Sequence, residues 1–410
     1  MNKLTITPKS LHGSVLVPPS KSIAHRAIIC AALSDSTSVI KNISFSDDIT
    51  ATINAVKLAG AEISITNDTL YIKGIQTAKA APDEAFDCNE SGSTLRFLVP
   101  IMATLFPKAS FTGKGRLGKR PLDVYYRIFD TQNITYSVCE EPFSLSINGK
   151  LQGGSIEVPG DISSQFITGL LLALPLSETD SEIIVTEALE SKGYIDLTLD
   201  VMKAFGIEIV NEDYRRFLIK GNQKYSSCDY TVEGDYSQAA FFEVANFIGN
   251  DIKINGMNPF SLQGDKQILD IVSSLKSASE DELIVIDGSQ CPDIMPIAAV
   301  AASLRRGETH LVNIGRLRLK ESDRLSAIAE ELTKLGGKIK VVENSLIING
   351  ADSFNGADVD SHNDHRIAMM LAIASTRSSG RVTISGYESV SKSYPDFFEV
   401  FRSLGGVCCE

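Results

Sequence analysis

The 410-residue chain has no tryptophan, no excess of basic residues and no long apolar run. Its 39 lysine and arginine residues face 51 aspartate and glutamate residues, which gives a formal net charge of −12. A protein that binds a nucleic acid backbone needs a basic face, and a membrane span needs roughly 18 consecutive apolar residues. The N-terminus also lacks a signal-peptide pattern. We therefore expect a soluble cytoplasmic protein that binds neither nucleic acid nor membrane.

Cysteine and histidine are scarce as well, at seven and five residues. The cysteines form no CxxC pair and no spacing typical of a Cys/His metal site, and their odd number suits reduced, packed thiols. We expect no metal. With 43% apolar residues, and at roughly 100–200 residues per domain, the chain is long enough for two or three globular domains.

A helical pattern with apolar residues at i, i+3, i+4 and i+7 recurs six times along the chain. The copies start at Ala24, Leu95, Ile167, Phe241, Ile294 and Ile367, with separations of 71, 72, 74, 53 and 73 residues. Each copy is followed by a predicted strand, usually by a second helix that ends at glycine, and by a strand that ends at glycine, such as Leu283 to Gly288. A unit of this size cannot bury two helices and a sheet alone, so the units must pack together.

Three units per domain is the natural division of an α/β (α+β) chain with six repeats. The chain is expected to cross between domains at Gly234-Asp235, and the segment from Lys3 to Val17 is predicted to be a strand with no helix before it. That strand would complete the last unit, which stops short at Glu410. The predicted domains are residues 1–20 with 235–410, and residues 21–234.

The residues before each first helix are polar, and several are cationic. Serine, threonine, aspartate and asparagine there are N-caps, worth about 1 kcal/mol each. Lys21, Arg26 and Arg366, however, add positive charge near helix ends that are already positive, which costs stability unless an anion binds. Ser22 and Arg26 share a helix face and could bind one phosphate; a solvated surface arginine is the alternative for Arg26.

Two further segments concentrate basic residues. Residues 114–120 form a glycine-rich basic loop before a helix predicted to start at Pro121. Lys320 and Arg324 flank the predicted cap of another helix, either Ser322 or Asp323, and a capping box with a surface ion pair is the alternative interpretation. In an acidic chain, both segments indicate local anion binding.

Seven short motifs lie in order over essentially the whole chain. They are Pro19–Ser22 with Arg26, Ser91–Arg96, Arg116 with Arg120 and Pro121, Ser163–Gln165, Lys320–Arg324, Asn363–Arg366 and Lys392–Asp396. Together they resemble the EPSP synthases, or 3-phosphoshikimate 1-carboxyvinyltransferases, a family of enolpyruvyl transferases. The resemblance implies two domains of three βαβαββ repeats each, in an inverse α/β barrel-like architecture, with the chain crossing twice between them.

The resemblance also implies a reaction and its residues. The enolpyruvyl group of phosphoenolpyruvate would pass to the 5-hydroxyl of shikimate 3-phosphate, with release of phosphate and without a cofactor. Phosphoenolpyruvate would be held by Lys21, Gly92, Arg120, Gln165, Arg324, Arg366 and Lys392. Shikimate 3-phosphate would be held by Lys21, Ser22, Arg26, Ser163, Ser164, Gln165, Ser191, Tyr194, Asp293 and Lys320.

The acid and base candidates implied by the motifs are Lys21, Asp293 and Glu321. Asp293 is expected to accept the proton of the 5-hydroxyl, and Glu321, with Lys21, to handle the proton on C3 of phosphoenolpyruvate. Two positions depart from the family pattern. Arg316 stands where some members have a substrate-contacting asparagine, and Ser91, where alanine is common, is expected to add a hydroxyl near phosphoenolpyruvate.

Three alternatives are weaker. The sister enolpyruvyl transferases of UDP-N-acetylglucosamine typically carry a cysteine in the mobile loop, which residues 114–120 lack, and have no Ser-Ser-Gln motif like that at 163–165. A non-catalytic anion-binding protein would not need Lys21, Asp293 and Glu321 together. An RNA 3′-phosphate cyclase is disfavoured by the acidic balance. We expect a monomer whose partners are small anionic substrates.

Overall fold

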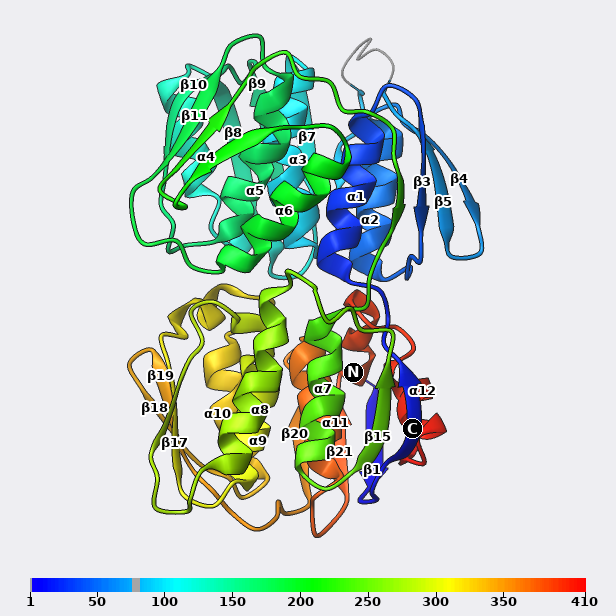
Figure 1. The fold of residues 1–410 in the computed structure, drawn as a ribbon, viewed down its shortest axis with the longest axis vertical. Coiled ribbons are helices and arrows are strands. Elements are labelled where there is room, and N and C mark those ends of the chain that lie inside the picture. Colours follow the sequence, from blue (N-terminus) through cyan, green and yellow to red (C-terminus); the bar gives the residue numbers. More distant parts are fainter. Residues whose placement is uncertain (1, 76–81) are drawn as a thin grey trace. The chain divides into compact units, whose positions relative to one another are not determined.

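The computed structural model describes residues 2–75 and 82–410, so Met1, the first residue of a predicted domain, lies outside the described part. The chain divides into two compact units (Figure 1). Unit 1 comprises Met1–Pro18 and Gly234–Glu410, and unit 2 comprises Pro19–Glu233. Each unit has its own hydrophobic core. The mixed α/β fold expected from the sequence is therefore confirmed.

Unit 2 contains three repeats of the same order. The first helices of the repeats are α1 (Lys21–Leu33), α3 (Gly92–Leu105) and α5 (Ser164–Ala173), and the second helices are α2 (Asp47–Leu58), α4 (Asp123–Thr131) and α6 (Lys192–Ala204). The strands are β3 (Thr37–Lys41), β4 (Glu62–Thr66), β5 (Thr69–Lys73), β6 (Phe86–Asp87), β7 (Lys108–Thr112), β8 (Thr135–Glu140), β9 (Phe143–Asn148), β10 (Gly154–Val158), β11 (Ser181–Val185), β12 (Ile209–Glu212), β13 (Arg216–Ile219) and β14 (Asp229–Thr231).

The strands of unit 2 form three four-stranded sheets with one topology. Their orders are β14-β3-β5-β4, β6-β7-β9-β8 and β10-β11-β13-β12. In each sheet the first two strands are parallel and the last two form an antiparallel hairpin. The first helix of the repeat connects the parallel pairs β6/β7 and β10/β11. This is the βαβαββ repeat. The first sheet takes its edge strand, β14, from the far end of the unit.

Unit 1 follows the same plan with one shortened repeat. Its first helices are α7 (Tyr236–Phe247), α9 (Met295–Leu304) and α11 (His365–Ser375), and its second helices are α8 (Ile268–Ser277), α10 (Arg324–Lys334) and α12 (Phe397–Ser403). Its strands are β1 (Lys3–Thr7), β2 (His12–Leu16), β15 (Asp251–Asn255), β16 (Ile284–Asp287), β17 (Glu308–Val312), β18 (Lys338–Val342), β19 (Ser345–Asn349), β20 (Ala357–Asp360), β21 (Val382–Ser385) and β22 (Val407–Cys409).

The N-terminal segment forms two strands where the sequence predicted one. β1 lies between β21 and β22 and is antiparallel to both, which confirms that the start of the chain completes the last repeat. Pro8 follows β1, and proline has no N–H to continue the ladder. The chain then starts again as β2, which pairs in parallel with β15.

The fourth repeat lacks the hairpin of the other repeats. The predicted closing strand at 283–288 is β16, and it pairs in parallel with β17. It therefore opens the sheet β16-β17-β19-β18 of the next repeat, and its assignment as a closing strand was wrong. Between α8 and β16 the described chain has no strand pair, which accounts for the short spacing of 53 residues.

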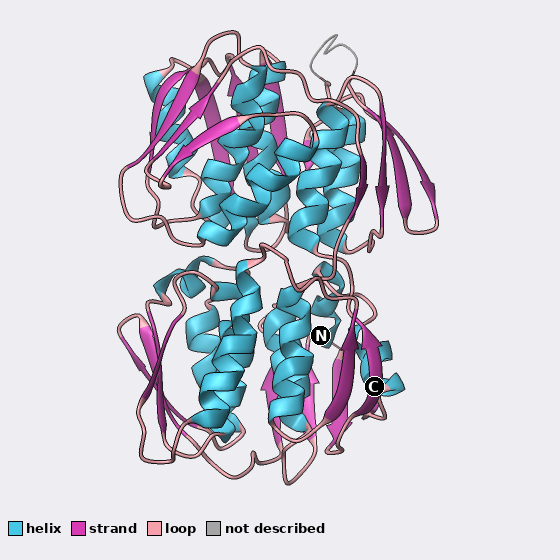
Figure 2. Ribbon diagram, in the orientation of Figure 1, coloured by secondary structure: helices cyan, strands magenta, loops and turns pink. Residues whose placement is uncertain are grey.

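The first helices are buried on nearly all sides. Every residue of α11 is buried, as is nearly all of α3, and in each unit the helices gather in the middle with strands around them (Figure 2). Apart from Glu243 of α7, the lysine, arginine and acidic residues of these helices lie in the first two turns. No helix in the described residues is long and apolar enough to cross a membrane. All seven cysteines, each in the described part, are free thiols.

Candidate active site

Lys21 is the first residue of α1, and its charge is matched by a carboxylate from another helix. Its Nζ donates a hydrogen bond to Oδ2 of Asp48 at 2.6 Å, and the two side chains are 16% and 10% exposed. The sequence predicted an anion near this helix end, and the carboxylate of Asp48 is one. Asp48 was not predicted as a site residue, because an aspartate in a first turn after the N-cap Ser46 looks like ordinary helix capping.

Arg26 is a buried connector and not a solvated surface residue. Its Nε donates to Oγ1 of Thr198 at 2.8 Å, and its Nη2 donates to Oγ1 of Thr168 and to the carbonyl of Tyr194. Its Nη1 donates to the carbonyl of Ser22 at 2.6 Å. Burial lowers the pKa of Arg26 to about 10. Within the described residues, four of its five N–H groups bind protein oxygens, so Arg26 holds α1, α5 and α6 together and has one N–H for a ligand.

The hydroxyl residues predicted for shikimate 3-phosphate lie at the starts of these same helices. Ser163 is the N-cap of α5, where its Oγ accepts from the N–H of Gln165 at 3.3 Å, and Ser164 is 5% exposed. Ser191 is the N-cap of α6, with a left-handed φ of 58°. Because Arg26 also binds the Tyr194 carbonyl, the structure brings the starts of α1, α5 and α6 into one group of polar side chains.

Gly92, Arg120 and Gln165, all predicted for phosphoenolpyruvate, surround the start of α3. A Cβ on Gly92 would lie 2.5 Å from Nη1 of Arg120, so the guanidinium rests on the glycine. Gln165 donates to Oγ of Ser93 at 3.0 Å and accepts from Nη1 of Arg96 at 2.8 Å. Arg96 was not assigned a role from the sequence, although it lies in a quoted motif.

The basic loop before α4 folds differently from its prediction. A 3₁₀ turn forms at Leu117–Lys119, and α4 starts at Asp123, two residues after the predicted start at Pro121. Pro121 instead offers its carbonyl to Nη2 of Arg96 at 2.9 Å. Arg120 is 8% exposed, whereas Lys114 and Arg116 are exposed.

In unit 1, Arg324 at the start of α10 connects three carboxylates. It donates to Oδ1 of Asp293 at 3.0 Å, to Oε2 of Glu321 at 2.6 Å, and to both oxygens of Asp364 at 2.7 and 3.2 Å. Its side chain is 2% exposed. The three carboxylates outweigh the effect of burial, which alone would lower the pKa of Arg324, and raise it above its usual value. Asp323, not Ser322, caps α10.

Two further cationic side chains bind Asp293. Lys320 donates to its Oδ1 at 3.0 Å, and Arg366 donates to its Oδ2 at 3.3 Å. Burial would raise the pKa of Asp293, but the attraction of Lys320, Arg366 and Arg324 holds it well below its usual range. Burial also lowers the pKa of Lys320, although the Asp293 charge opposes this. The Asp293 carboxylate is therefore ionised at neutral pH.

The last motifs join this cluster through α11. Asp364 is fully buried, caps α11 and accepts from the hydroxyl of Ser322 at 3.0 Å. Lys392, 7% exposed, donates from Nζ to the carbonyl of Asn363 at 2.7 Å. Asp364 was missed as a positioning residue because, in sequence, it is simply an N-cap. Unit 1 thus brings together Asp293, Lys320, Glu321, Arg324, Arg366 and Lys392.

The two departures from the family pattern have structural accounts. The Ser91 hydroxyl is fully buried and accepts from the N–H of Thr94 at 3.2 Å, so it caps α3 directly before Gly92. Arg316 donates from Nη2 to the carbonyl of Ser289 at 3.0 Å.

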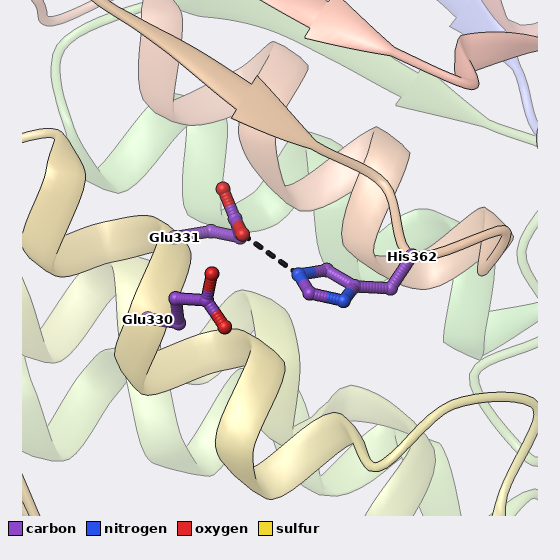
Figure 3. Close-up of side chains that lie close together, drawn as sticks. All are labelled: Glu330, Glu331 and His362. Atoms are coloured by element: carbon purple, nitrogen blue, oxygen red, sulfur yellow. Dashed lines mark hydrogen bonds and ion pairs between the residues drawn. The ribbon is translucent and has the colours of Figure 1, made fainter. Parts of the chain in front are cut away.

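One set of side chains in the described residues has donor atoms spaced as for a metal. The ligand atoms of Glu330, Glu331 and His362 lie within 4.8 Å of one another (Figure 3). The ammonium of Lys334 lies 2.9 Å from Glu330 and 2.8 Å from Glu331, and His362 contacts Glu331 at 2.7 Å. This is an ion-pair network around a buried carboxylate, and the Lys334 cation already binds both glutamates.

Comparison with known proteins agrees with this arrangement. The family model for EPSP synthase (3-phosphoshikimate 1-carboxyvinyltransferase) matches residues 6–401. The chain belongs to the EPSP synthase family. It is 53% identical to the 3-phosphoshikimate 1-carboxyvinyltransferase of Clostridium botulinum (strain Alaska E43 / Type E3), over 99% of this chain and 98% of that protein. It is 52% identical to that of Clostridioides difficile (strain 630), with the same coverage.

Solved EPSP synthases also share the fold. One from Acinetobacter baumannii is 26% identical, covers the whole of both chains and superposes with a TM-score of 0.81. The predicted family, the two-domain fold with repeated βαβ units, and the transferase class are thus confirmed. Four of the seven motifs quoted from the sequence lie in unit 2 and three in unit 1.

Proposed function

We propose that the chain transfers the enolpyruvyl group of phosphoenolpyruvate to the 5-hydroxyl of shikimate 3-phosphate, with release of phosphate. One observation carries the assignment of roles: a single guanidinium, Arg324, holds both Asp293 and Glu321. This contact supports the proposal that the acid and the base lie beside cations that can bind an anionic substrate. Both substrates are anions, and the positive charges of Arg120, Arg366 and Lys392 would offset their charge.

Asp293 is the proposed base for the 5-hydroxyl. Its depressed pKa keeps it ionised but makes it a weak proton acceptor. Arg324 and Arg366 also belong to the proposed phosphoenolpyruvate site. When the phosphate and carboxylate of phosphoenolpyruvate bind Arg324 and Arg366, the attraction of these two arginines for Asp293 weakens. The basicity of Asp293 then rises. Substrate binding thus activates the base.

Glu321 and Lys21 are the proposed groups for the proton on C3 of phosphoenolpyruvate. The reaction adds the alcohol across the enol ether, which requires a proton on C3, and then eliminates phosphate, which requires its removal. Nζ of Lys21 donates a hydrogen bond to Asp48. We further propose that the protein acts as a cytoplasmic monomer without a cofactor.

The test is to mix the protein with phosphoenolpyruvate and shikimate 3-phosphate, without added metal or nucleotide, and to measure phosphate release. Asp293→Asn should lower kcat by about 10²–10⁴-fold, the range for a general base. Asp323→Asn is the matched control, because asparagine caps a helix as well as aspartate. No release by the wild type, or equal release with UDP-N-acetylglucosamine, would contradict the proposal.

A further inference from the structure

A buried chain of hydrogen bonds connects three helices of unit 2 behind the proposed phosphoenolpyruvate site. His25 of α1 contacts Oγ1 of Thr52 in α2 through Nδ1 at 2.8 Å, and Thr52 contacts Oγ1 of Thr94 in α3 at 2.7 Å. Thr94 then donates to Oγ of Ser91 at 2.7 Å. His25 is 1% exposed, and the other three residues are fully buried. None of these side chains has a role in the proposed reaction.

The direction of these hydrogen bonds follows from the number of protons. Thr94 has one hydroxyl proton, which is directed to Oγ of Ser91 at 2.7 Å and to the carbonyl of Asp48 at 3.4 Å, so in its contact with Thr52 it accepts. Thr52 therefore donates to Thr94 and must accept from His25. The ring proton of His25 is then on Nδ1, and Nε2, which has no hydrogen-bond partner among the described residues, carries none.

The surroundings of His25 favour this neutral form. Burial, followed by the positive charges of Lys21 and Arg26, lowers its pKa well below the usual value. The ring also packs edge-on against Phe97, at 6.3 Å between centroids. Because the neutral ring carries its single proton on Nδ1, it donates a hydrogen bond to Thr52 and cannot accept one from it.

The chain of hydrogen bonds ends at the start of α3, beside residues proposed to bind phosphoenolpyruvate. Ser91 caps α3 and precedes Gly92, on which the Arg120 guanidinium rests. A small displacement of Ser91 and Gly92 would therefore move the first N–H groups of α3 and the Arg120 guanidinium together.

We propose that His25 is a positioning residue for phosphoenolpyruvate: through Thr52, Thr94 and Ser91, its Nδ1–H fixes the start of α3. The proposal rests on the proposed function for the identity of the ligand. It does not place His25 in contact with substrate, and the shikimate 3-phosphate residues of α5 and α6 lie outside the chain of hydrogen bonds.

Three His25 variants separate the hydrogen bond from simple packing. His25→Leu removes the donor, His25→Asn retains an N–H near the position of Nδ1, and His25→Gln moves it toward the position of Nε2. His25→Leu and His25→Gln should raise the KM for phosphoenolpyruvate about tenfold, with the KM for shikimate 3-phosphate within about twofold of wild type. His25→Asn should restore the wild-type KM within about threefold.

Thr52, the next residue in the chain of hydrogen bonds, provides an independent test. Thr52→Val should match His25→Leu, Thr52→Ser should match wild type, and the double variant of His25→Leu and Thr52→Val should be no worse than either single variant. Equal effects of His25→Asn and His25→Leu, a parallel rise of both KM values, or additive effects in the double variant would overturn the proposal.

Nitrogen NMR of ¹⁵N-histidine protein tests the tautomer without turnover. We expect the His25 signal, assigned by its loss in His25→Asn, to show a protonated Nδ1 and an unprotonated Nε2 at pH 7. An Nε2-protonated or doubly protonated ring would overturn the proposal. A wild-type protein without activity would reject the proposed function, and the NMR result would still decide the hydrogen-bond chain.

Discussion

Arg324 shows how the chain uses a buried cation. A guanidinium that is 2% exposed must be paired, and the pairing here involves Asp293, Glu321 and Asp364 together. Asp364 is held by Ser322 as well and fixes the orientation of the guanidinium. Asp293 and Glu321 are the members that face the proposed chemistry. Binding of an anion at Arg324 is therefore linked to the protonation of the two proposed acid/base groups.

Gly92→Ala tests whether Arg120 binds phosphoenolpyruvate. The new Cβ would lie 2.5 Å from Nη1 of Arg120, so the guanidinium must move away. We expect the KM for phosphoenolpyruvate to rise about tenfold or more, because a charge-assisted hydrogen bond contributes about 1.5–3 kcal/mol. The KM for shikimate 3-phosphate should stay within about twofold. Steady-state kinetics with each substrate varied in turn measures both values.

Arg120→Met provides the comparison for this variant. If Gly92→Ala acts by displacing Arg120, the double variant should be no worse than Arg120→Met alone. Alanine favours a helix more than glycine does, so the melting temperature of Gly92→Ala should not fall. Additive effects on KM would show that the glycine acts independently of Arg120.

The charged site residues could be predicted from the sequence, but their partners could not. Lys21 and Arg366 stand out because a cation at a helix N-terminus opposes the helix dipole. Asp48 pairs with Lys21 from a different helix, 27 positions later, and no local pattern indicates such a contact. The same holds for Arg26, whose helical spacing fits a surface position, whereas Thr168 and Thr198 bind it in the core.

At the scale of helices and strands, the 3.6-residue period found all six first helices. It could do so because these helices are apolar over most of their surface. The pairing of the strands was harder to predict, because the sequence of a single strand does not indicate which strand lies beside it. The segment at 283–288 has the composition of a closing strand, but its partner is β17 of the next repeat. Only the spacing of 53 residues indicated that a hairpin was absent.

The turn between β20 and α11 is held by a buried carboxylate on α10. Glu331, fully buried, accepts from the backbone N–H of Asp360 at 2.9 Å, from Lys334 at 2.8 Å and from His362 at 2.7 Å. His362 has a left-handed φ of 51°, a conformation that costs energy outside glycine. These contacts place Asn363 next to the site, where its carbonyl binds Lys392.

This cluster should make stability depend on pH. The hydrogen bond to Glu331 raises the pKa of His362, while Glu330 and Asp360 add attraction. A group whose pKa is higher in the folded state stabilises it fully below the unfolded pKa, about 6.5, and loses this effect as pH rises through the folded pKa. His362→Gln should therefore cost on the order of 1 kcal/mol more at pH 6 than at pH 9. Urea unfolding at both pH values measures the difference.

Glu331 sets the lower limit of the pH range in which its contact with His362 stabilises the folded protein. Burial opposes ionisation of Glu331, but hydrogen bonds from His362, Lys334 and Asp360 lower its pKa. Its contribution is thus present above the unfolded value of about 4.3 and is lost as pH falls. His310→Gln is the matched control, because His310 contacts Glu308 at 2.7 Å on a strand where Glu308 is 44% exposed. Equal pH dependence in both variants would contradict the role of burial.

At the scale of the whole molecule, contacts between distant parts of the chain define the two units. β1 pairs with β21 and β22 near the C-terminus, and β14 pairs with β3 about 190 positions earlier. The sequence allowed the first of these pairings to be inferred, because the last repeat was one strand short. Nothing in the sequence indicated the second pairing, because β14 follows the third repeat and most of unit 2 separates it from β3.

The distribution of predicted ligand residues over the two units leads to the last prediction. Most of those for shikimate 3-phosphate lie in unit 2, whereas those for phosphoenolpyruvate are divided between both units. Ser164→Ala should therefore raise the Kd of shikimate 3-phosphate several-fold, about 1 kcal/mol for one hydrogen bond. Lys392→Met should leave that Kd within about twofold and raise the KM for phosphoenolpyruvate at least tenfold.

Calorimetry with shikimate 3-phosphate alone gives its Kd without turnover, and initial rates give the KM for phosphoenolpyruvate. Lys338→Met is the matched control, because it removes the same charge from an exposed strand position of unit 1 and should change neither value. A weaker Kd for shikimate 3-phosphate in Lys392→Met, equal to that in Ser164→Ala, would contradict the division. In that case Lys392 would bind shikimate 3-phosphate as well as phosphoenolpyruvate, and repulsion between the two anions would have to be offset there.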